Sequence, residues 1–168
     1  MLDKCGKKWE IIVKCGCEVM ITGEYRYSLD EKGRIMIPVK MRTEIAGNVM
    51  ILTRGVDRCL WIFPTDEWKR ISENILASTS LFQEKARLIQ RRIIAPAQEA
   101  EIDRAGRMSI PQTLREFAGL KKECIVLGML KYIEIWDAET YIAYLDSNET
   151  SFKEAAEELG GKVDLWKS

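Results

Sequence analysis

The sequence contains no histidine among its 168 residues. Histidine is the commonest general base in enzymes, so its absence excludes Ser-His and Cys-His catalysis. The chain also lacks any apolar run approaching the roughly 20 residues that span a bilayer, and its start has no uninterrupted apolar stretch of the kind found in signal peptides. We therefore expect a cytoplasmic protein without a membrane segment.

Cysteine is scarce and unevenly placed. Three of the five cysteines lie near the start as Cys5, Cys15 and Cys17, whereas Cys59 and Cys124 lie far apart in apolar surroundings. An odd count without secretion predicts reduced thiols. The first three could act as soft metal ligands, but they lack the paired two-residue spacing of a zinc site and have no fourth cysteine nearby. We expect neither a metal nor a cofactor.

A net charge of one sign is also missing, since 26 basic residues balance 26 acidic ones. Their distribution is uneven, because residues 137–168 hold eight of the acidic residues and three of the basic ones, which leaves 23 basic and 18 acidic residues ahead of them. A mildly basic body beside an acidic tail can present a basic face to nucleic acid. An evenly solvated surface fits the charge count equally well.

The chain carries the pattern Asp-x-x-Gly-Arg twice, as Asp30–Arg34 and Asp103–Arg107. The offset of 73 residues that aligns these stretches also aligns, without a gap, Ile37 with Ile110, Pro38 with Pro111, Arg42 with Arg115, Gly55 with Gly128, and Trp68 with Tyr141. Matches spread over about forty positions indicate two copies of one module. With 46% hydrophobic and 31% charged residues, these copies have the composition of a globular domain.

Each copy is expected to mix strands and helices. In the first, a strand turns at residues 31–33 and resumes at residues 34–37, which predicts a β-hairpin whose Gly33 supplies a positive φ. Pro38 opens a short helix that Gly47 ends. A second hairpin and a longer helix follow, and the second copy repeats this order. The remaining expected strands are residues 49–55, 59–63, a strand ending at residue 102, 107–110, 124–130 and 132–136. The remaining expected helices are residues 65–75, 112–119 and one from residue 137 onward.

These patterns predict five parts of the chain. They are an N-terminal extension (1–19), a first module (20–78), a connecting helix (79–96), a second module (97–146), and an acidic C-terminal helix and tail (147–168). Apolar residues at helical spacing indicate the connecting helix. The glutamate-rich stretch 151–160 predicts the last helix, ending at Gly160.

The Asp-x-x-Gly-Arg turn has a physical rationale of its own. An aspartate before a tight turn can accept hydrogen bonds from the turn or from the arginine four residues later, and either holds the loop rigid. A fixed guanidinium suits a phosphate or the O6/N7 edge of guanine. Alternatively, the two Asp-Arg pairs only brace their turns. A shared-proton dyad of Asp30 and Asp103 is a third possibility, but the arginines would keep both carboxylates ionised.

Four stretches of the sequence closely resemble the MraZ family of bacterial transcriptional regulators, which is related to the AbrB-like swapped-hairpin proteins. They are MITGEYRYSLDEKGRIMIPVKMR from Met20, LTRGVDRCLWIFPTDEW, EAEIDRAGRMSIPQTLREFAGL and IEIWDAETY. The resemblance runs from Met20 to about Leu159. It implies an α+β fold of two tandem swapped-hairpin β-barrel modules, with pseudo-two-fold symmetry and flanking helices.

The resemblance also implies a function. It indicates a ring-shaped homo-oligomer on the nucleoid that binds direct repeats of double-stranded DNA in the promoter of the division and cell-wall gene cluster. Family members start at a methionine that corresponds to Met20, so we expect residues 1–19 to be dispensable. The rival interpretation is a protein-interaction ring or antitoxin-like partner whose basic turns bind an acidic protein.

Our candidate DNA-binding residues lie on the two turns and on the short helices that follow them. Asp30, Arg34, Asp103 and Arg107 fall on the DNA-binding motif of the family. The complete set is Asp30, Lys32, Gly33, Arg34, Arg42, Asp103, Arg104, Gly106, Arg107 and Arg115.

Overall fold

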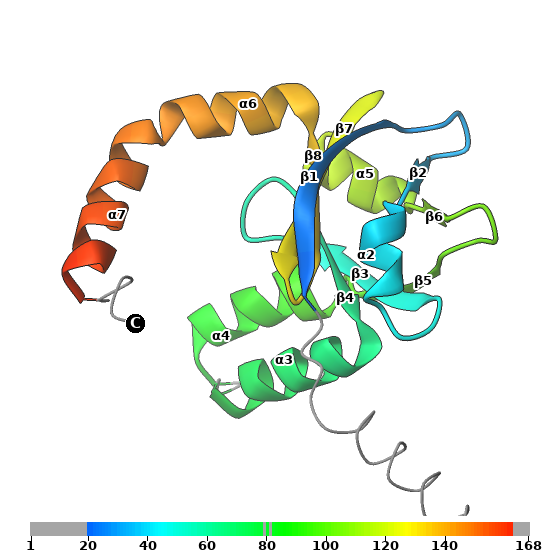
Figure 1. Ribbon diagram of the computed structural model, residues 1–168. Coiled ribbons are helices and arrows are strands. Elements are labelled where there is room, and N and C mark those ends of the chain that lie inside the picture. The colour runs from blue at the N-terminus through cyan, green and yellow to red at the C-terminus, as the bar shows by residue number, and fades with distance from the viewer. Residues whose placement is uncertain (1–19, 79, 81, 163–168) are drawn as a thin grey trace, which may run out of the picture.

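The computed structural model describes residues 20–78, 80 and 82–162, which fold as an α+β protein (Figure 1). The expected extension 1–19, with its three cysteines, lies outside this range. The eight strands are β1 (Ile21–Ser28), β2 (Arg34–Met36), β3 (Val49–Arg54), β4 (Leu60–Pro64), β5 (Gln98–Glu101), β6 (Arg107–Ser109), β7 (Glu123–Leu130) and β8 (Ile133–Asp137). The helices are α2 (Val39–Thr43), α3 (Thr65–Ser78), α4 (Glu84–Ile89), the π-helix η1 (Gln90–Ile94), α5 (Gln112–Ala118), α6 (Ala138–Ser147) and α7 (Glu149–Lys162).

Six strands form one antiparallel sheet in the order β1-β7-β8-β4-β3-β5, and β2 pairs with β6 in a separate ribbon. The 73-residue offset maps β1, β2, β3 and β4 onto β5, β6, β7 and β8, so the order of the sheet is the same from either edge. Its centre is the pair Trp61↔Glu134, two residues that are themselves 73 apart. The strand pairing is therefore symmetric under exchange of the two repeats.

The two β-hairpins predicted around the Asp-x-x-Gly-Arg turns are wrong, because the strands before and after each turn pair with strands of the other repeat. The strand before the first turn, β1, pairs with β7 of the other repeat, and the strand after it, β2, pairs with β6. In the second repeat β5 pairs with β3. The two sides of its turn are joined by an isolated bridge between Ile102 and Met108 and by the hydrogen bond from the N–H of Asp103 to the Arg107 carbonyl, not by a ladder between β5 and β6. Alternation of apolar residues assigns a face to each side chain, but it does not name the partner strand.

The second hairpin of each repeat is confirmed, since β3 pairs with β4 and β7 pairs with β8. The sheet is open at β1 and β5, so the strand pairing of the described residues does not close a barrel. No described helix is both long and apolar enough to cross a membrane.

Helix boundaries follow the predicted signals with some exceptions. The Asp137 carboxylate accepts the N–H of Thr140 at 3.1 Å and caps α6, and Gly119 ends α5 with φ of 62°. The first short helix stops earlier than expected, at Thr43. The connecting helix begins only at Glu84, and α7 continues through Gly160 to Lys162. Glycine inside a helix costs only about 1 kcal/mol, which the flanking helix-forming residues offset.

Both repeats supply the main core. Ile35 and Ile62 of the first repeat and Met108 and Ile135 of the second are all fully buried in it. A smaller cluster surrounds Trp136, which is 3% exposed, with the half-buried Trp61 and Tyr141 packed against it. The core is therefore shared between the repeats, and neither repeat alone contains all the side chains that form it.

We expect neither residues 20–96 nor residues 97–162 to fold when expressed alone, because β1, β2, β5 and β6 all pair with the other repeat. An equimolar mixture should recover helix and sheet, since the missing pairs are then supplied in trans. Circular dichroism and NMR chemical-shift dispersion of each fragment and of the mixture measure this. A fragment that gives a dispersed, native-like spectrum by itself would contradict the expectation.

Candidate nucleic-acid interface

The ribbon of β2 and β6 places the two motif arginines on one surface. Its three antiparallel pairs are Arg34↔Ser109, Ile35↔Met108 and Met36↔Arg107. The central pair, Ile35 and Met108, is fully buried. Because side chains alternate between the faces of a strand, Arg34 and Arg107 lie together on the opposite, outward face. They are diagonal neighbours across the ribbon, a separation of roughly 7 Å.

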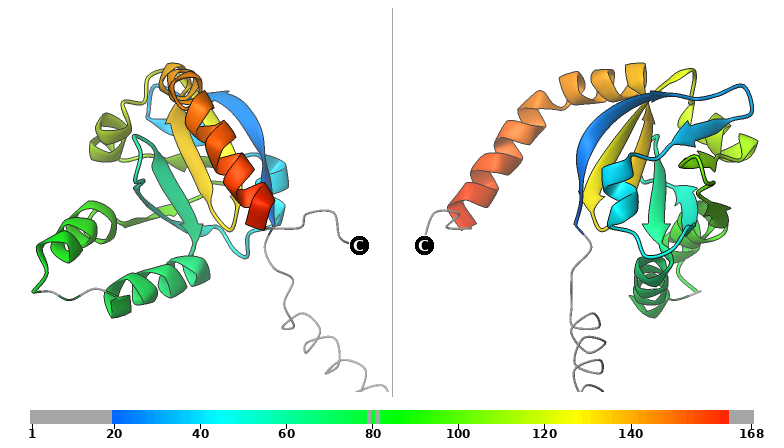
Figure 2. Two further views of the ribbon diagram at one scale, coloured as in Figure 1. Left: turned by 90° about the vertical axis from the view of Figure 1, so that its left-hand side faces the viewer. Right: turned by 45° about the vertical axis from the view of Figure 1, so that its right-hand side comes forward.

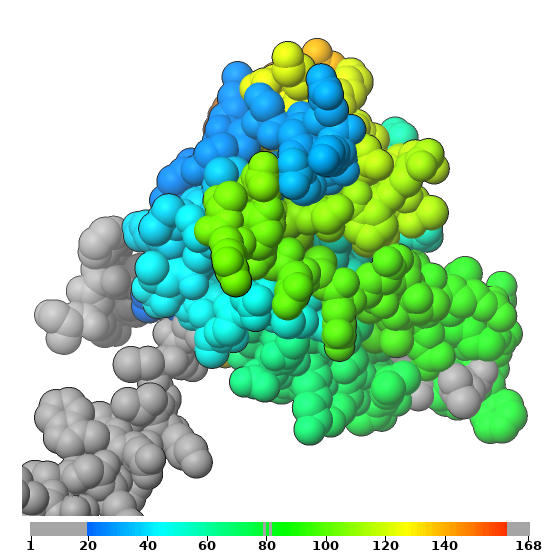
Figure 3. Space-filling view, turned by 90° about the vertical axis from the view of Figure 1, so that its right-hand side faces the viewer, coloured from blue at the N-terminus to red at the C-terminus, as the bar shows by residue number. Residues whose placement is uncertain are grey.

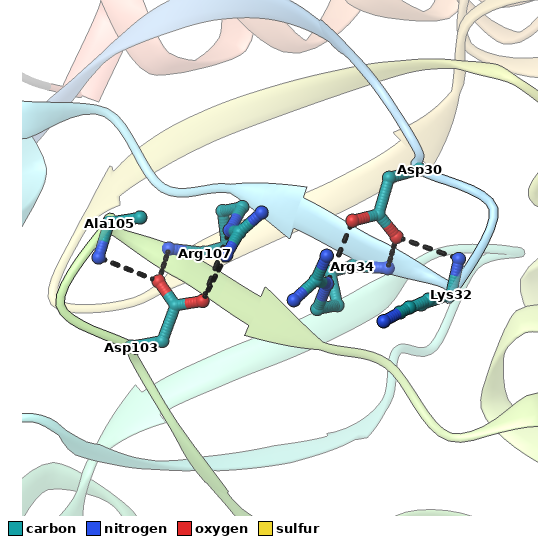
Figure 4. A network of polar contacts seen from close by, with 6 residues as sticks. All are labelled: Asp30, Lys32, Arg34, Asp103, Ala105 and Arg107. Atoms are coloured by element: carbon teal, nitrogen blue, oxygen red, sulfur yellow. Dashed lines mark hydrogen bonds and ion pairs between the residues drawn. The ribbon is translucent and has the colours of Figure 1, made fainter.

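Each arginine follows a tight turn at one end of the ribbon (Figure 4). In the first turn one carboxylate oxygen of Asp30 accepts the N–H groups of Lys32 and Arg34, both at 2.9 Å, and the other accepts Nε of Arg34 at 2.7 Å. The N–H of Gly33 donates to the Asp30 carbonyl at 2.9 Å. Gly33 has φ of 73°, which a residue with a side chain rarely adopts.

The second turn repeats this geometry. Asp103 accepts the N–H groups of Ala105 and Arg107 at 2.9 Å, and its second oxygen lies 3.1 Å from Nε and 3.0 Å from Nη2 of Arg107. Gly106 has φ of 83°. The predicted Asp-Arg pairing is thus present in both repeats. Viewed from the side of the ribbon, the blue surface of the first turn borders the light-green surface of the second (Figure 3).

The same hydrogen bonds act on the two aspartates. The N–H of Arg34 is the main cause that lowers the pKa of Asp30, and it outweighs a partial desolvation that raises it. The guanidinium of Arg34 and the N–H of Lys32 lower it further. The pKa of Asp103 is lowered in the same way, first by the N–H of Arg107. A shared-proton dyad raises one of its two pKa values, so the geometry argues against that alternative.

The arginines are less exposed than free fingers would be. The side chains of Arg34 and Arg107 are 28% and 36% exposed, and each is held against its own turn. Among the described residues, Arg34 donates to Asp30 through Nε alone. Both terminal amino groups of Arg34 therefore remain available to a ligand on the outward face.

The other candidates lie at different places around the ribbon. Lys32 and Arg104 are exposed at the tips of the turns. Arg42 and Arg115 each contact the turn of the opposite repeat. Arg42 lines a surface pocket of about 330 Å³ whose lining also includes Asp103 and Arg104.

Sequence reasoning missed two residues on the outward face, Met36 and Ser109, which pair across the ribbon with Arg107 and Arg34. Counting two residues on from Arg34 and from Arg107 would have found them. Among the described residues, no group of three or more histidine, cysteine, aspartate or glutamate side chains could hold a metal ion. Cys59 and Cys124 are buried free thiols.

A family profile and several curated relatives show which family the chain resembles. The sequence profile described as "MraZ protein, putative antitoxin-like" matches the chain twice, over residues 20–92 and 93–162. A "Transcriptional regulator MraZ" from Treponema denticola is 55% identical over 140 residues, covering 83% of this chain and 97% of the relative. Proteins of the same name from Treponema pallidum and Halothermothrix orenii are 47% and 42% identical, over 82% and 84% of this chain and 93% and 99% of their own lengths.

The lowered pKa values of Asp30 and Asp103 predict how stability depends on pH. Groups with a folded-state pKa below the ordinary value of 3.8 stabilise the fold above that pH, and their contribution is lost as pH falls below it. The thermal midpoint of the wild type should therefore approach that of the double variant Asp30→Asn, Asp103→Asn between pH 5 and pH 2. Calorimetry across this range measures the gap, and a gap that stays constant would contradict the expectation.

Proposed function

The chain belongs to the MraZ family, and we propose that it is a transcriptional regulator that binds promoter DNA through the outward face of the β2–β6 ribbon. The observation that carries the proposal is the pair Arg34 and Arg107 on this face, each held by an aspartate of its own turn. A two-stranded ribbon fits the major groove of B-DNA, where arginine can bind guanine O6 and N7 with two hydrogen bonds.

The fixed geometry of the two arginines favours recognition over a purely structural brace. A side chain that is already ordered loses less conformational entropy when it binds. Lys32 and Arg104, exposed at the turn tips, are placed to contact phosphates on either side of the groove. The second turn is the more positive one, because it carries Arg104 where the first carries Glu31.

Several copies of the ribbon are needed for tight binding, because competing cations weaken each phosphate contact. We propose a homo-oligomeric ring with the swapped-hairpin architecture of the family, which the exchange of β2 and β6 supports. Such a ring would bind direct repeats roughly 10 bp apart, so that each repeat faces the same side of the DNA. We place this operator upstream of the protein's own gene, within the division and cell-wall cluster on the nucleoid.

The C-terminal arm, formed by α6 and α7, supports assembly. It extends away from the sheet (Figure 2) and exposes Ile142, Leu145 and Phe152, the last of them by 71%. A pocket of about 520 Å³ lies at the bend between α6 and α7. The arm is acidic, whereas η1 contributes the exposed Arg91 and Arg92 beside the apolar surface of α4. An arm that docks on α4 and η1 of the next copy makes a head-to-tail contact, which generates a ring when it closes.

A salt series of DNA binding distinguishes this function from binding of an acidic protein. If the protein binds DNA, the logarithm of its association constant for the upstream DNA should fall linearly with the logarithm of the salt concentration. The slope of this line reports the number of phosphates contacted. Sequence preference should survive an excess of competitor DNA. Absence of sequence preference at every salt concentration would favour the protein-binding alternative.

Arg34→Ala and Arg107→Ala should each weaken specific DNA binding, because a lost guanine contact costs about 1–3 kcal/mol per site. This corresponds to roughly a 5- to 150-fold loss of affinity for each contacted repeat. Arg70→Ala is the control, since Arg70 forms an exposed ion pair with Glu67 on α3, away from the ribbon. Unchanged DNA affinity with a lowered thermal midpoint would show that the arginines only brace their turns.

Leu145→Asp combined with Phe152→Asp should reduce the assembly to smaller species, because the arm loses its exposed apolar contacts. Light scattering reports the mass, and DNA binding reports the consequence. Affinity for DNA with several repeats should fall, whereas affinity for a single repeat should not. Thr150→Asp, a charge at an exposed polar position of α7, is the control. A full-sized assembly in the double variant would contradict the role of the arm.

A further inference from the structure

Each motif glycine is covered by an arginine from the other repeat. A β-carbon built on Gly33 would lie 2.7 Å from Cζ and 2.9 Å from Nε of Arg115. A β-carbon built on Gly106 would lie 2.5 Å from Cζ of Arg42. Since 73 residues separate both the two glycines and the two arginines, the same contact is made twice, in opposite directions. A β-carbon at either position would displace the guanidinium from the place it occupies.

Backbone hydrogen bonds tie the same segments together. The carbonyl of Gly106 accepts the N–H of Ile37 at 2.9 Å, and the carbonyl of Gly33 accepts the N–H of Ile110 at 2.9 Å. Ile37 immediately precedes Pro38 and α2, the helix that carries Arg42. Nε of Arg42 also donates to the Ile37 carbonyl at 3.0 Å. Gly106 is therefore held twice by the first repeat, through the backbone N–H of Ile37 and through the side chain of Arg42.

The guanidinium of Arg115 is partly buried at this contact. Nε of Arg115 is buried and has no hydrogen-bond partner among the described residues. Its position against the buried Gly33 is a packing contact of a flat group on the backbone of the turn. Lysine lacks a planar head group and cannot reproduce this contact, although it preserves the charge.

We propose that Arg42 and Arg115 are positioning residues, each of which holds the DNA-reading turn of the opposite repeat. Arg115 packs on the turn that presents Arg34, and Arg42 packs on the turn that presents Arg107. Loss of Arg115 in the second repeat should therefore alter the position of Arg34 in the first repeat. Loss of Arg42 should likewise alter the position of Arg107. The consequence for DNA rests on the proposed function, but the effect on the turns does not.

Hydrogen exchange of backbone amides in the full chain, without DNA, tests the positioning directly. In Arg115→Ala, the amides of Gly33 and Arg34 should exchange at least roughly tenfold faster, because the side chain that covers their turn is gone. The amides of Gly106 and Arg107 should keep their wild-type rates. Arg42→Ala should give the reverse pattern. Faster exchange confined to the turn of the mutated repeat, or no change in either turn, would overturn the proposal.

The conservative variant Arg115→Lys separates positioning from direct contact with phosphate. It keeps the charge and much of the aliphatic stem, so it should stay folded even if Arg115→Ala does not. Positioning by a flat group predicts fast exchange at Gly33 and Arg34 in this variant as well. Wild-type exchange in Arg115→Lys, with DNA affinity retained, would instead identify Arg115 as a simple charge.

Double variants extend the test to DNA. Arg115→Ala should be non-additive with Arg34→Ala in DNA affinity, because both act through the first turn, and additive with Arg107→Ala. The opposite pairing of effects would contradict cross-repeat positioning. If the protein binds no DNA, this cycle fails while the exchange pattern persists, so failure of the proposed function can be told from failure of the positioning role.

Glycine substitutions provide a control for backbone strain. Gly47 has φ of 87° and nothing within 4 Å of an added β-carbon, whereas an added β-carbon at Gly33 meets Arg115. Gly33→Ala should therefore lower the thermal midpoint more than Gly47→Ala in the wild type. The difference should shrink in the Arg115→Ala background, and an unchanged difference would show that the guanidinium does not pack on Gly33.

Discussion

The antiparallel pairing of β2 with β6 is the contact on which the rest of the molecule depends. It joins residues far apart in the sequence, so forming it closes a long loop at an entropic cost. Burial of Ile35 and Met108 at its centre helps to offset that cost. The same three pairs that bury these side chains place Arg34 and Arg107 outside. The strand pairs that form this part of the core are thus the same pairs that form the candidate interface.

The aspartates connect this scaffold to recognition. Asp30 and Asp103 each organise a turn through backbone N–H groups and orient an arginine through its guanidinium. Ion pairs as exposed as these contribute little to stability, so bracing alone is a weak reason to keep the pair in both repeats. Arg34, fixed through Nε, leaves both of its amino groups to a ligand, whereas Arg107 contacts Asp103 through Nη2 as well as Nε. Bracing and reading are therefore compatible roles of one side chain.

Local chemistry in the sequence predicts the local structure well. The positive φ of Gly33, the start of a helix at Asp137 and the β3–β4 hairpin each depend on residues a few positions apart. The exchange of strands between repeats depends on pairs that lie far apart in the sequence, from Leu52↔Gln98 to Ile21↔Leu130. An apolar alternation is equally satisfied by a partner strand from either copy.

The same limit applies to the site. The motif identifies both turns and their Asp-Arg pairs, because these lie within five residues. The positions of Arg42 and Arg115 could not be predicted, since the duplication shows which residues are equivalent but not which repeat each contacts.

Hydrogen–deuterium exchange of the assembled protein, with and without the DNA upstream of its gene, tests the role of the ribbon most directly. If the outward face of β2 and β6 reads DNA, protection on binding should concentrate in residues 30–37 and 103–110. Specific binding that leaves both segments unprotected, with protection on α3 and α4 instead, would contradict it.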